Sequence, residues 1–352
     1  VNDIIESRTS MTNMEKIRLC QELVDQIQVE SRRPVCRLHL SREPFGVADS
    51  HLGGVPYVPR NGQIPTDEDG SQLWLCAQIN FAQMPRLEGF PEEGILQIFL
   101  SDMGLDDFGL CGEETGDGTS QDDWKIAWYP EVDGSVTMEE CDAKMAVPWA
   151  KASKKNMPRH AHKFDLQEIE NGDVDLWRCP NVPLKIIFRP AVQEGVGDEE
   201  YLFNELFCAA LKARLPDADS NEFDTCELRS DVPEEREALD RLEKQMERGG
   251  CKIGGHPRYY QSDPRENPYR GMTEELLKRY SIPPEEVRKA LARTAWDTLL
   301  FQLDDDFTCF PAGEMDDMDL YLGGCGSMNL LIRAEDLKKR DFSHVLAQWA
   351  CT

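Results

Sequence analysis

The stretch IGGHPRYY, residues 253–260, has a counterpart in LGGVPYVP, residues 52–59. Each contains two glycines, one variable residue and a proline. Glycine can adopt positive φ and proline fixes φ, so the shared motif predicts a tight turn that directs the neighbouring strand. The residues of the two turns are Gly53, Gly54, Pro56, Gly254, Gly255 and Pro257. We interpret both as structural turns; the alternative is that the N–H groups of each glycine pair bind an anionic ligand.

Segments of similar composition follow each turn in the same order. Three apolar, strand-like segments are residues 73–81, 94–101 and 124–131 in the first half, and residues 298–306, 326–333 and 344–351 in the second half. The repeated order predicts an internal duplication. Polar loops rather than regular crossover helices join the segments, so we expect an α+β protein of two pseudo-repeated, mostly antiparallel β-rich halves with helical insertions.

Helical patterns mark the boundaries of these halves. We expect residues 1–34 to form an N-terminal helical segment and residues 35–196 to form the first β-rich half, with an irregular C-terminal part. Residues 197–352 then contain a helical insert and the second half. A further helical insert near residues 273–296 has no counterpart in the first half. The halves either are separate domains or share one compact domain.

The chain is strongly acidic. It has 352 residues, with 39 Lys and Arg against 66 Asp and Glu, and a formal net charge of −27. Such a surface repels phosphate backbones, so we expect no nucleic-acid partner. The acidic excess either maintains solubility or attracts a protein partner with a basic face.

The twelve cysteines are scattered along the chain, and no two of them form a Cys-x-x-Cys pair. Several lie in apolar segments, where cysteine acts as a small hydrophobic residue. This usage favours a reducing compartment over a disulfide framework. Because there is also no apolar run of bilayer length and no signal-peptide pattern, we expect a cytoplasmic protein without membrane contact.

Two glutamines lie inside apolar strands of the two halves. Gln78 is followed two residues later by Asn80, and Gln302 is followed by Asp304. A buried amide without partners costs about 1–3 kcal/mol, so each glutamine must be hydrogen-bonded. Each one either ties its strand to a neighbouring loop or faces a cleft between the halves, where it would bind a polar ligand.

The second turn continues into a polar tail that the first turn lacks. It contains Asp263, which precedes Pro264 and is therefore biased towards extended backbone, and Arg265. The two charges either form an internal ion pair that holds the loop, or Arg265 binds a carboxylate or phosphate in a bidentate contact. The candidate ligand-binding residues are Gln261, Asp263, Arg265, Gln78, Gln302 and Asp304.

The remaining charged clusters match no metal or catalytic motif. The carboxylates at residues 304–306 and 314–319 lack EF-hand spacing, and we expect them in solvated loops. The basic segment 151–163 either balances the acidic body or binds an anionic ligand or partner. No phosphate-binding loop, nucleophile elbow or dinucleotide fingerprint occurs, so we assign no catalytic residue, no metal site and no cofactor.

These motifs resemble the YwqG-like family, bacterial-type proteins that contain a domain of unknown function. The matching segments include HLGGVPYVP at residues 51–59, LCAQINFAQMP at residues 75–85 and NLLIRAEDLKKRDFSHV at residues 329–345. The resemblance implies a compact α+β fold of two similar halves and no established reaction. Where the family usually carries Trp-Gly-Asp, this chain has Leu322-Gly323-Gly324, which argues against an activity that depends on that aspartate.

Two functions fit these features. The first is a non-catalytic binding module, one version of which neutralises a basic protein, as an immunity protein neutralises a secreted nuclease toxin. The second is an enzyme or small-molecule receptor with a polar cleft between the two halves. The missing catalytic signature and the acidic charge favour the first function over an enzyme.

Overall fold

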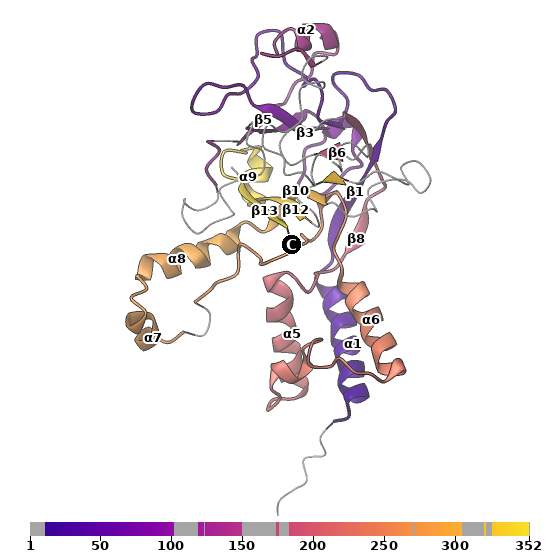
Figure 1. Cartoon of the computed structure of the whole chain (residues 1–352), viewed down its shortest axis with the longest axis vertical. Helices are drawn as coiled ribbons and strands as arrows, with labels where there is room; N and C mark the ends of the chain where they lie inside the picture. The colour runs from indigo at the N-terminus through magenta and orange to yellow at the C-terminus, as the bar shows by residue number, and fades with distance from the viewer. Residues whose placement is uncertain are drawn as a thin grey trace, which may run out of the picture.

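The computed structural model describes residues 11–101, 119–122, 124–149, 174–175, 183–269, 272–304, 320–321 and 326–351. Three parts can be distinguished in Figure 1: a β-sheet body, a bundle of three helices, and a pair of short helices that we call the arm. The bundle extends below the body in this view and the arm extends to its left, so the two project in different directions (Figure 1).

The body is built on one large curled sheet. Its strands are β1 (Arg33–Ser41), β2 (His51–Leu52), β3 (Trp74–Asn80), β4 (Ile95–Leu100), β5 (Trp124–Tyr129), β7 (Leu184–Phe188), β8 (Val192–Glu194), β9 (Lys252–Gly254), β10 (Thr298–Asp304), β12 (Gly326–Ile332) and β13 (Leu346–Cys351). The pairings within this sheet are antiparallel. A separate parallel pair consists of β6 (Val174–Asp175) and β11 (Leu320–Tyr321). The structure therefore has the expected α+β class with mostly antiparallel strands.

The strand order is β13-β12-β10-β9-β1-β7-β2-β3-β4-β5, and β8 pairs with the beginning of β1. The antiparallel pair β1 and β7 lies at the centre, with Leu38 opposite Phe188. Beyond β7 come four strands from residues 51–129, which we call the first wing. Beyond β1 come four strands from residues 252–351, the second wing. Each wing adds its strands outward in chain order.

The two wings share a hydrophobic core. β4 and β12 are buried along their whole length, which means that both faces of each strand are covered. On one face of β4, Leu96 and Ile98 belong to the same core as Met328 and Leu330 of β12. The other face of β4 packs in a separate cluster that includes Phe99. The curl of the sheet thus allows residues of both wings to contribute to one core.

The bundle consists of α1 (Asn13–Glu30), α5 (Tyr201–Arg214) and α6 (Pro233–Met246). α1 begins with a capping box, in which the N–H of Glu15 donates to Thr12 Oγ1 and the N–H of Thr12 donates to Glu15 Oε2. Its buried stripe follows helical spacing. The stripe is formed by Ile17, Cys20, Leu23, Val24 and Ile27. These side chains pack with α5 and α6 in a core separate from that of the sheet, so the N-terminal helix joins the helical insert of the second half.

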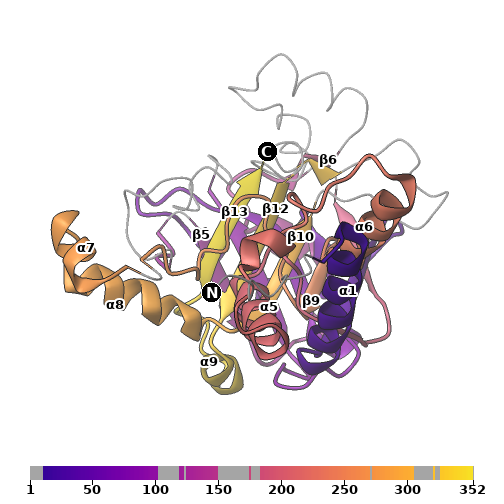
Figure 2. The same cartoon turned by 90° about the horizontal axis from the view of Figure 1, so that it is seen from below.

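The shorter helices are α2 (Met138–Asp142), α9 (Ala334–Lys339) and the two helices of the arm, α7 (Glu274–Arg279) and α8 (Pro284–Ala292). Figure 2, which views the molecule from below, again shows the arm standing away from the sheet. Within the described part of the chain, no helix has the length and apolar character that crossing a membrane requires.

All four glycines of the Gly-Gly-x-Pro turns have positive φ. The angles are 57° at Gly53, 81° at Gly54, 72° at Gly254 and 73° at Gly255. At Gly255, an added Cβ would lie 2.7 Å from an oxygen of the Glu194 carboxylate and 2.8 Å from the nearest side-chain carbon of the central strand β1. The second turn therefore needs glycine both for its backbone conformation and for close packing.

We predict that Gly255→Ala destabilises the protein more than alanine at another glycine with positive φ. Left-handed backbone costs an alanine about 1–2 kcal/mol, and overpacking adds about 1–3 kcal/mol. Gly70→Ala is the matched control, because Gly70 has a φ of 82° and no heavy atom within 4 Å of its Cβ position. Urea denaturation measures both free energies of unfolding. Equal losses in the two variants would contradict the packing role.

Candidate functional site

Gln78 on β3 ties the first turn to the first wing. Its buried side chain accepts a hydrogen bond at Oε1 from the N–H of Tyr57, at 2.8 Å. Its Nε2 donates to the carbonyl oxygens of Val47 at 2.8 Å and Asp49 at 2.7 Å. Oε1 also accepts from Nε2 of Gln97 at 2.6 Å. The hydrogen-bonding capacity of this amide is therefore filled by the protein itself.

Gln302 on β10 makes the corresponding contacts in the second wing. Its Oε1 accepts a hydrogen bond from the N–H of Arg258 at 2.9 Å. Its Nε2 donates to the carbonyl oxygens of Gly250 at 2.8 Å and Arg248 at 3.2 Å. Tyr57 and Arg258 each follow the proline of a Gly-Gly-x-Pro turn. In both wings, a strand amide thus binds the backbone of the turn.

A second side-chain amide completes each arrangement. Gln97 on β4 lies opposite Gln78, and its Nε2 donates to the carbonyl oxygen of the residue after the first proline, at 2.7 Å. Asn329 on β12 lies opposite Gln302, and its Nδ2 donates to the carbonyl oxygen of the residue after the second proline, at 2.8 Å. We call each set an amide clamp. Neither Gln97 nor Asn329 was predicted from the sequence, although both are the fourth residue of the segment that begins with Gly94 or Gly326.

Asp263 and Arg265 form an ion pair inside the protein. Arg265 Nη2 lies 2.7 Å from Asp263 Oδ2, and its Nε lies 2.9 Å from Asp263 Oδ1. The same Nη2 lies 3.0 Å from Glu200 Oε1. Arg265 is 1% exposed and Asp263 is 4% exposed. The guanidinium therefore binds two carboxylates of its own chain.

His256 connects this ion pair to the helices of the bundle. Its Nδ1 lies 2.7 Å from Glu200 Oε2, and its Nε2 lies 2.8 Å from the carbonyl oxygen of Ser31. Burial alone would raise the pKa of Glu200, but the hydrogen bond with His256 and the charge of Arg265 outweigh burial and lower the pKa to about 2. Ser31 ends α1 and Glu200 precedes α5, so the second turn holds both helices.

A second buried ion pair joins the first. Lys252 Nζ lies 2.9 Å from Glu194 Oε1, and Arg37 Nη2 lies 2.5 Å from Glu194 Oε2. Burial alone would raise the pKa of Glu194, but the charges of Lys252 and Arg37 outweigh it and lower the pKa. Burial lowers the pKa of Lys252 to about 8, even though the Glu194 charge opposes this shift. The N–H of His256 donates to Glu194 Oε1 at 3.0 Å and so connects the two pairs.

Asp304 is fully buried at the end of β10. Its Oδ2 accepts a hydrogen bond from the N–H of Gly250 at 3.0 Å, and its Oδ1 accepts from the hydroxyl of Tyr260 at 3.1 Å. Gln302 on the same strand also binds Gly250, so these two candidate residues lie together and contact the same segment. The hydrogen-bond partners of Asp304 thus come from the segments on either side of β9.

The structure places the other predicted ligand-binding residues away from Gln302 and Asp304. Four strands lie between Gln78 on β3 and Gln302 on β10. The Asp263–Arg265 pair faces the carboxylate at the start of α5, and Gln261 is exposed. Buried candidates are thus distributed over two amide clamps and one ion-pair network.

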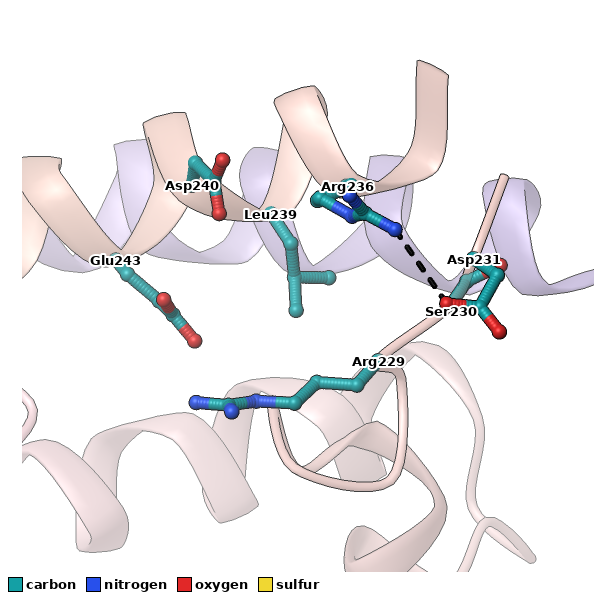
Figure 3. Close-up of a pocket in the computed structure, with 7 residues that line it drawn as sticks. All are labelled: Arg229, Ser230, Asp231, Arg236, Leu239, Asp240 and Glu243. Atoms are coloured by element: carbon teal, nitrogen blue, oxygen red, sulfur yellow. Dashed lines mark hydrogen bonds and ion pairs between the residues drawn. The ribbon is translucent and has the colours of Figure 1, made fainter. Parts of the chain in front are cut away.

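A cavity of about 420 Å³ lies at the bundle, outside the sheet body. Its lining residues are Arg229, Ser230, Asp231, Arg236, Leu239, Asp240 and Glu243. Figure 3 shows the carboxylates and guanidinium groups around the side chain of Leu239, with Arg236 Nη2 3.4 Å from Asp231 Oδ1. Charged groups of both signs and a single apolar side chain suit a charged polar group rather than an apolar cofactor. None of these residues was predicted from the sequence as part of a site.

The described residues contain no group of three or more His, Cys, Asp or Glu that could hold a metal ion. Several expected features lie outside the described residues. They are the acidic residues 305–306 and 314–319, the basic segment 151–163 and the tripeptide at residues 322–324.

One family matches most of the chain, including both turns, both amide clamps, α5 and α6. It is described as "Domain of unknown function (DUF1963)" and matches residues 50–351. The chain belongs to this family. The match covers both wings, β7 and β8 but begins after β1, so the DUF1963 domain of this chain comprises most of the sheet described above. No curated protein matches the DUF1963 chain.

We predict that each amide clamp of the DUF1963 domain contributes similarly to stability. Gln302→Leu leaves the N–H of Arg258 and the carbonyl oxygen of Gly250 without the partner that they have now, and each orphaned group costs about 1–3 kcal/mol. The carbonyl oxygen of Arg248 keeps its hydrogen bond from Lys252. Gln78→Leu removes the matching contacts in the first wing. Gln63→Leu, at an exposed residue, is the control and should change the free energy of unfolding by less than about 0.5 kcal/mol. A large loss in only one of the two clamp variants would contradict their equivalence.

We predict that Glu200 makes the stability of the domain pH-dependent in acid. Its folded-state pKa of about 2 lies below the ordinary value of 4.5, so its stabilising contribution is present above that value and is lost as the pH falls towards 2. The shift corresponds to about 3 kcal/mol. Glu200→Gln should flatten the dependence of urea midpoints on pH over this range. Glu227→Gln makes the same chemical change at an exposed residue, and equal slopes in both variants would refute the prediction.

Proposed function

We propose that this protein is a non-catalytic binding module that presents an acidic helical face to a basic protein partner. The face comprises α6 and the segment before it, residues 215–246, and we call it the acidic face. It contains eleven acidic residues and four basic ones. This concentration of negative charge in one part of the bundle is the observation that carries the proposal.

The position of the acidic face suits an encounter with another protein. Its acidic side chains are mostly exposed; on α6 they include Glu234, Glu237 and Asp240. α6 lies at the outside of the bundle in Figure 2, and the bundle projects from the sheet body in Figure 1. Negative charge on a projecting surface accelerates association with a basic partner and disfavours acidic ones.

The cavity on the acidic face gives the partner a place to insert a side chain. In Figure 3, Asp240 and Glu243 extend from α6 beside Leu239. A lysine or arginine of the partner could lay its aliphatic stem against Leu239 and place its charge near the two carboxylates. Neutralising a basic protein in this way is what an immunity protein does when its toxin is a nuclease.

The alternative of an enzyme or receptor with a cleft between the halves receives less support. It requires Asp263 and Arg265 to reach a ligand, whereas both are almost fully buried and bind each other and Glu200. Diverting Arg265 from its two carboxylates to a ligand would leave a buried charge unpaired, which typically costs about 3–5 kcal/mol.

We also propose that the chain is YwqG-like and that its two halves are pseudo-repeats. The outward strand order of both wings, the positive φ of both glycine pairs and the matching amide clamps support this proposal. The described free cysteines, several of them buried, suit a reducing cytoplasm.

We predict that the double variant Asp240→Lys/Glu243→Lys loses capture of a basic partner from cell extract. The control is Glu68→Lys/Asp69→Lys, which changes net charge equally in an exposed loop of the sheet body. Added salt should weaken capture by the wild type. The control variant should still capture the partner. Equal loss in both variants would show that net charge, rather than the acidic face, is responsible. Capture that neither variant nor salt affects would refute the proposed function.

A further inference from the structure

The arm, residues 272–295, has little packing of its own. α7 has no buried residue, and α8 has only Ala290. Two large apolar side chains are exposed on it, Tyr280 at 61% and Leu291 at 53%. Figures 1 and 2 both show the arm apart from the sheet and the bundle. It also corresponds to the helical insert that the first half of the chain lacks.

An isolated arm of this size is marginal as a helical structure. Helices shorter than about 12–15 residues are not stable in water without packing, and α8 has nine residues. Val287, Ala290 and Leu291 follow helical spacing, so α8 has one apolar side. The N-cap residue of α8, Pro283, makes no side-chain capping hydrogen bond. Ala290 is already buried, so the arm gains stability if a partner covers the exposed side chain of Leu291.

The charges of the arm identify the partner. Both helices begin with two acidic residues and carry basic residues further along. In α8 these are Glu285 and Glu286, then Arg288 and Lys289. If two copies of α8 pack antiparallel about a two-fold axis, the acidic start of each helix lies beside the basic part of the other. Parallel packing would instead place like charges together.

The net charge of the arm also permits a second copy to approach. The arm has four acidic and five basic residues, whereas the whole chain has a net charge of −27. Two copies therefore repel each other at most surfaces and much less at the arm. Projection from the body keeps the acidic bundles of the two copies apart.

We propose that the arm is a dimerisation element, in which α8 of two copies packs antiparallel and buries Leu291. This contact uses a different surface from the acidic face, so either proposal can fail without the other. Helix-to-helix contacts of this length bury little surface, which predicts a dimer of micromolar affinity rather than an obligate one.

Sedimentation equilibrium of the full chain tests the proposal. Measurements at about 0.15 M NaCl, where the Debye length is about 8 Å, screen the repulsion between the bodies. The wild type should be in monomer–dimer equilibrium at micromolar concentrations, and Leu291→Glu should raise the dissociation constant at least about tenfold. Val29→Glu is the control, because Val29 is 56% exposed on α1, away from the arm. A wild type that stays monomeric, or equal effects of the two variants, would overturn the proposal.

A charge-swap experiment tests whether α8 of one copy pairs with α8 of another. Glu285→Lys/Glu286→Lys makes α8 basic and Arg288→Glu/Lys289→Glu makes it acidic, so each variant alone should be monomeric. Their equimolar mixture should dimerise, because each basic helix then faces an acidic one. Thermal melting of each variant confirms that it folds. The proposal would be overturned if either variant formed dimers alone, or if the mixture stayed monomeric. A partner other than a second copy of the chain would then cover the arm.

Discussion

The burial of the Glu200 and Glu194 carboxylates is the constraint on which the arrangement of this molecule depends. Glu200 is fully buried and Glu194 is almost fully buried, so the chain must compensate each charge. Arg265 and Lys252 supply opposite charges, and His256 contacts both carboxylates. Through these contacts the end of α1, the start of α5, β8 and β9 are held at one place. The bundle is therefore fixed to the sheet by polar contacts, although each has its own apolar core.

Local sequence signals predicted much of the framework. The Gly-Gly-x-Pro motif predicted both turns, and the apolar runs predicted β3, β4, β10 and β12. A glutamine in an apolar run must find hydrogen-bond partners. Of the two alternatives given for these glutamines, a tie to a neighbouring loop describes the contacts of Gln78 and Gln302. The internal ion pair was likewise one alternative for Asp263 and Arg265. The signals behind these inferences are local in the sequence, although the contacts of Gln302 reach residues 44 to 54 positions away.

The features that the sequence did not reveal depend on distant residues. Glu200 and Arg265 are 65 positions apart, and Lys252 and Glu194 are 58 apart. A single sequence contains no signal that pairs such residues, because many other acids and bases are available. The cavity on α6 was missed for a similar reason: its helix and the preceding segment look like ordinary solvated surface until folding places them side by side. Among the described residues, buried charges are thus compensated by ion pairs, whereas the negative charges of the acidic face are concentrated at the surface.

The central position of β1 has a consequence for how the chain folds during synthesis. β1 is synthesised before both of its neighbours, β7 and β9, and β9 comes more than two hundred residues later. The first wing can assemble as a meander of local hairpins, but β1 has an unpaired edge until β9 is made. Such non-local pairing slows folding and leaves intermediates prone to aggregation. Until β9 has been synthesised, the open edge of β1 therefore exposes the nascent protein to aggregation.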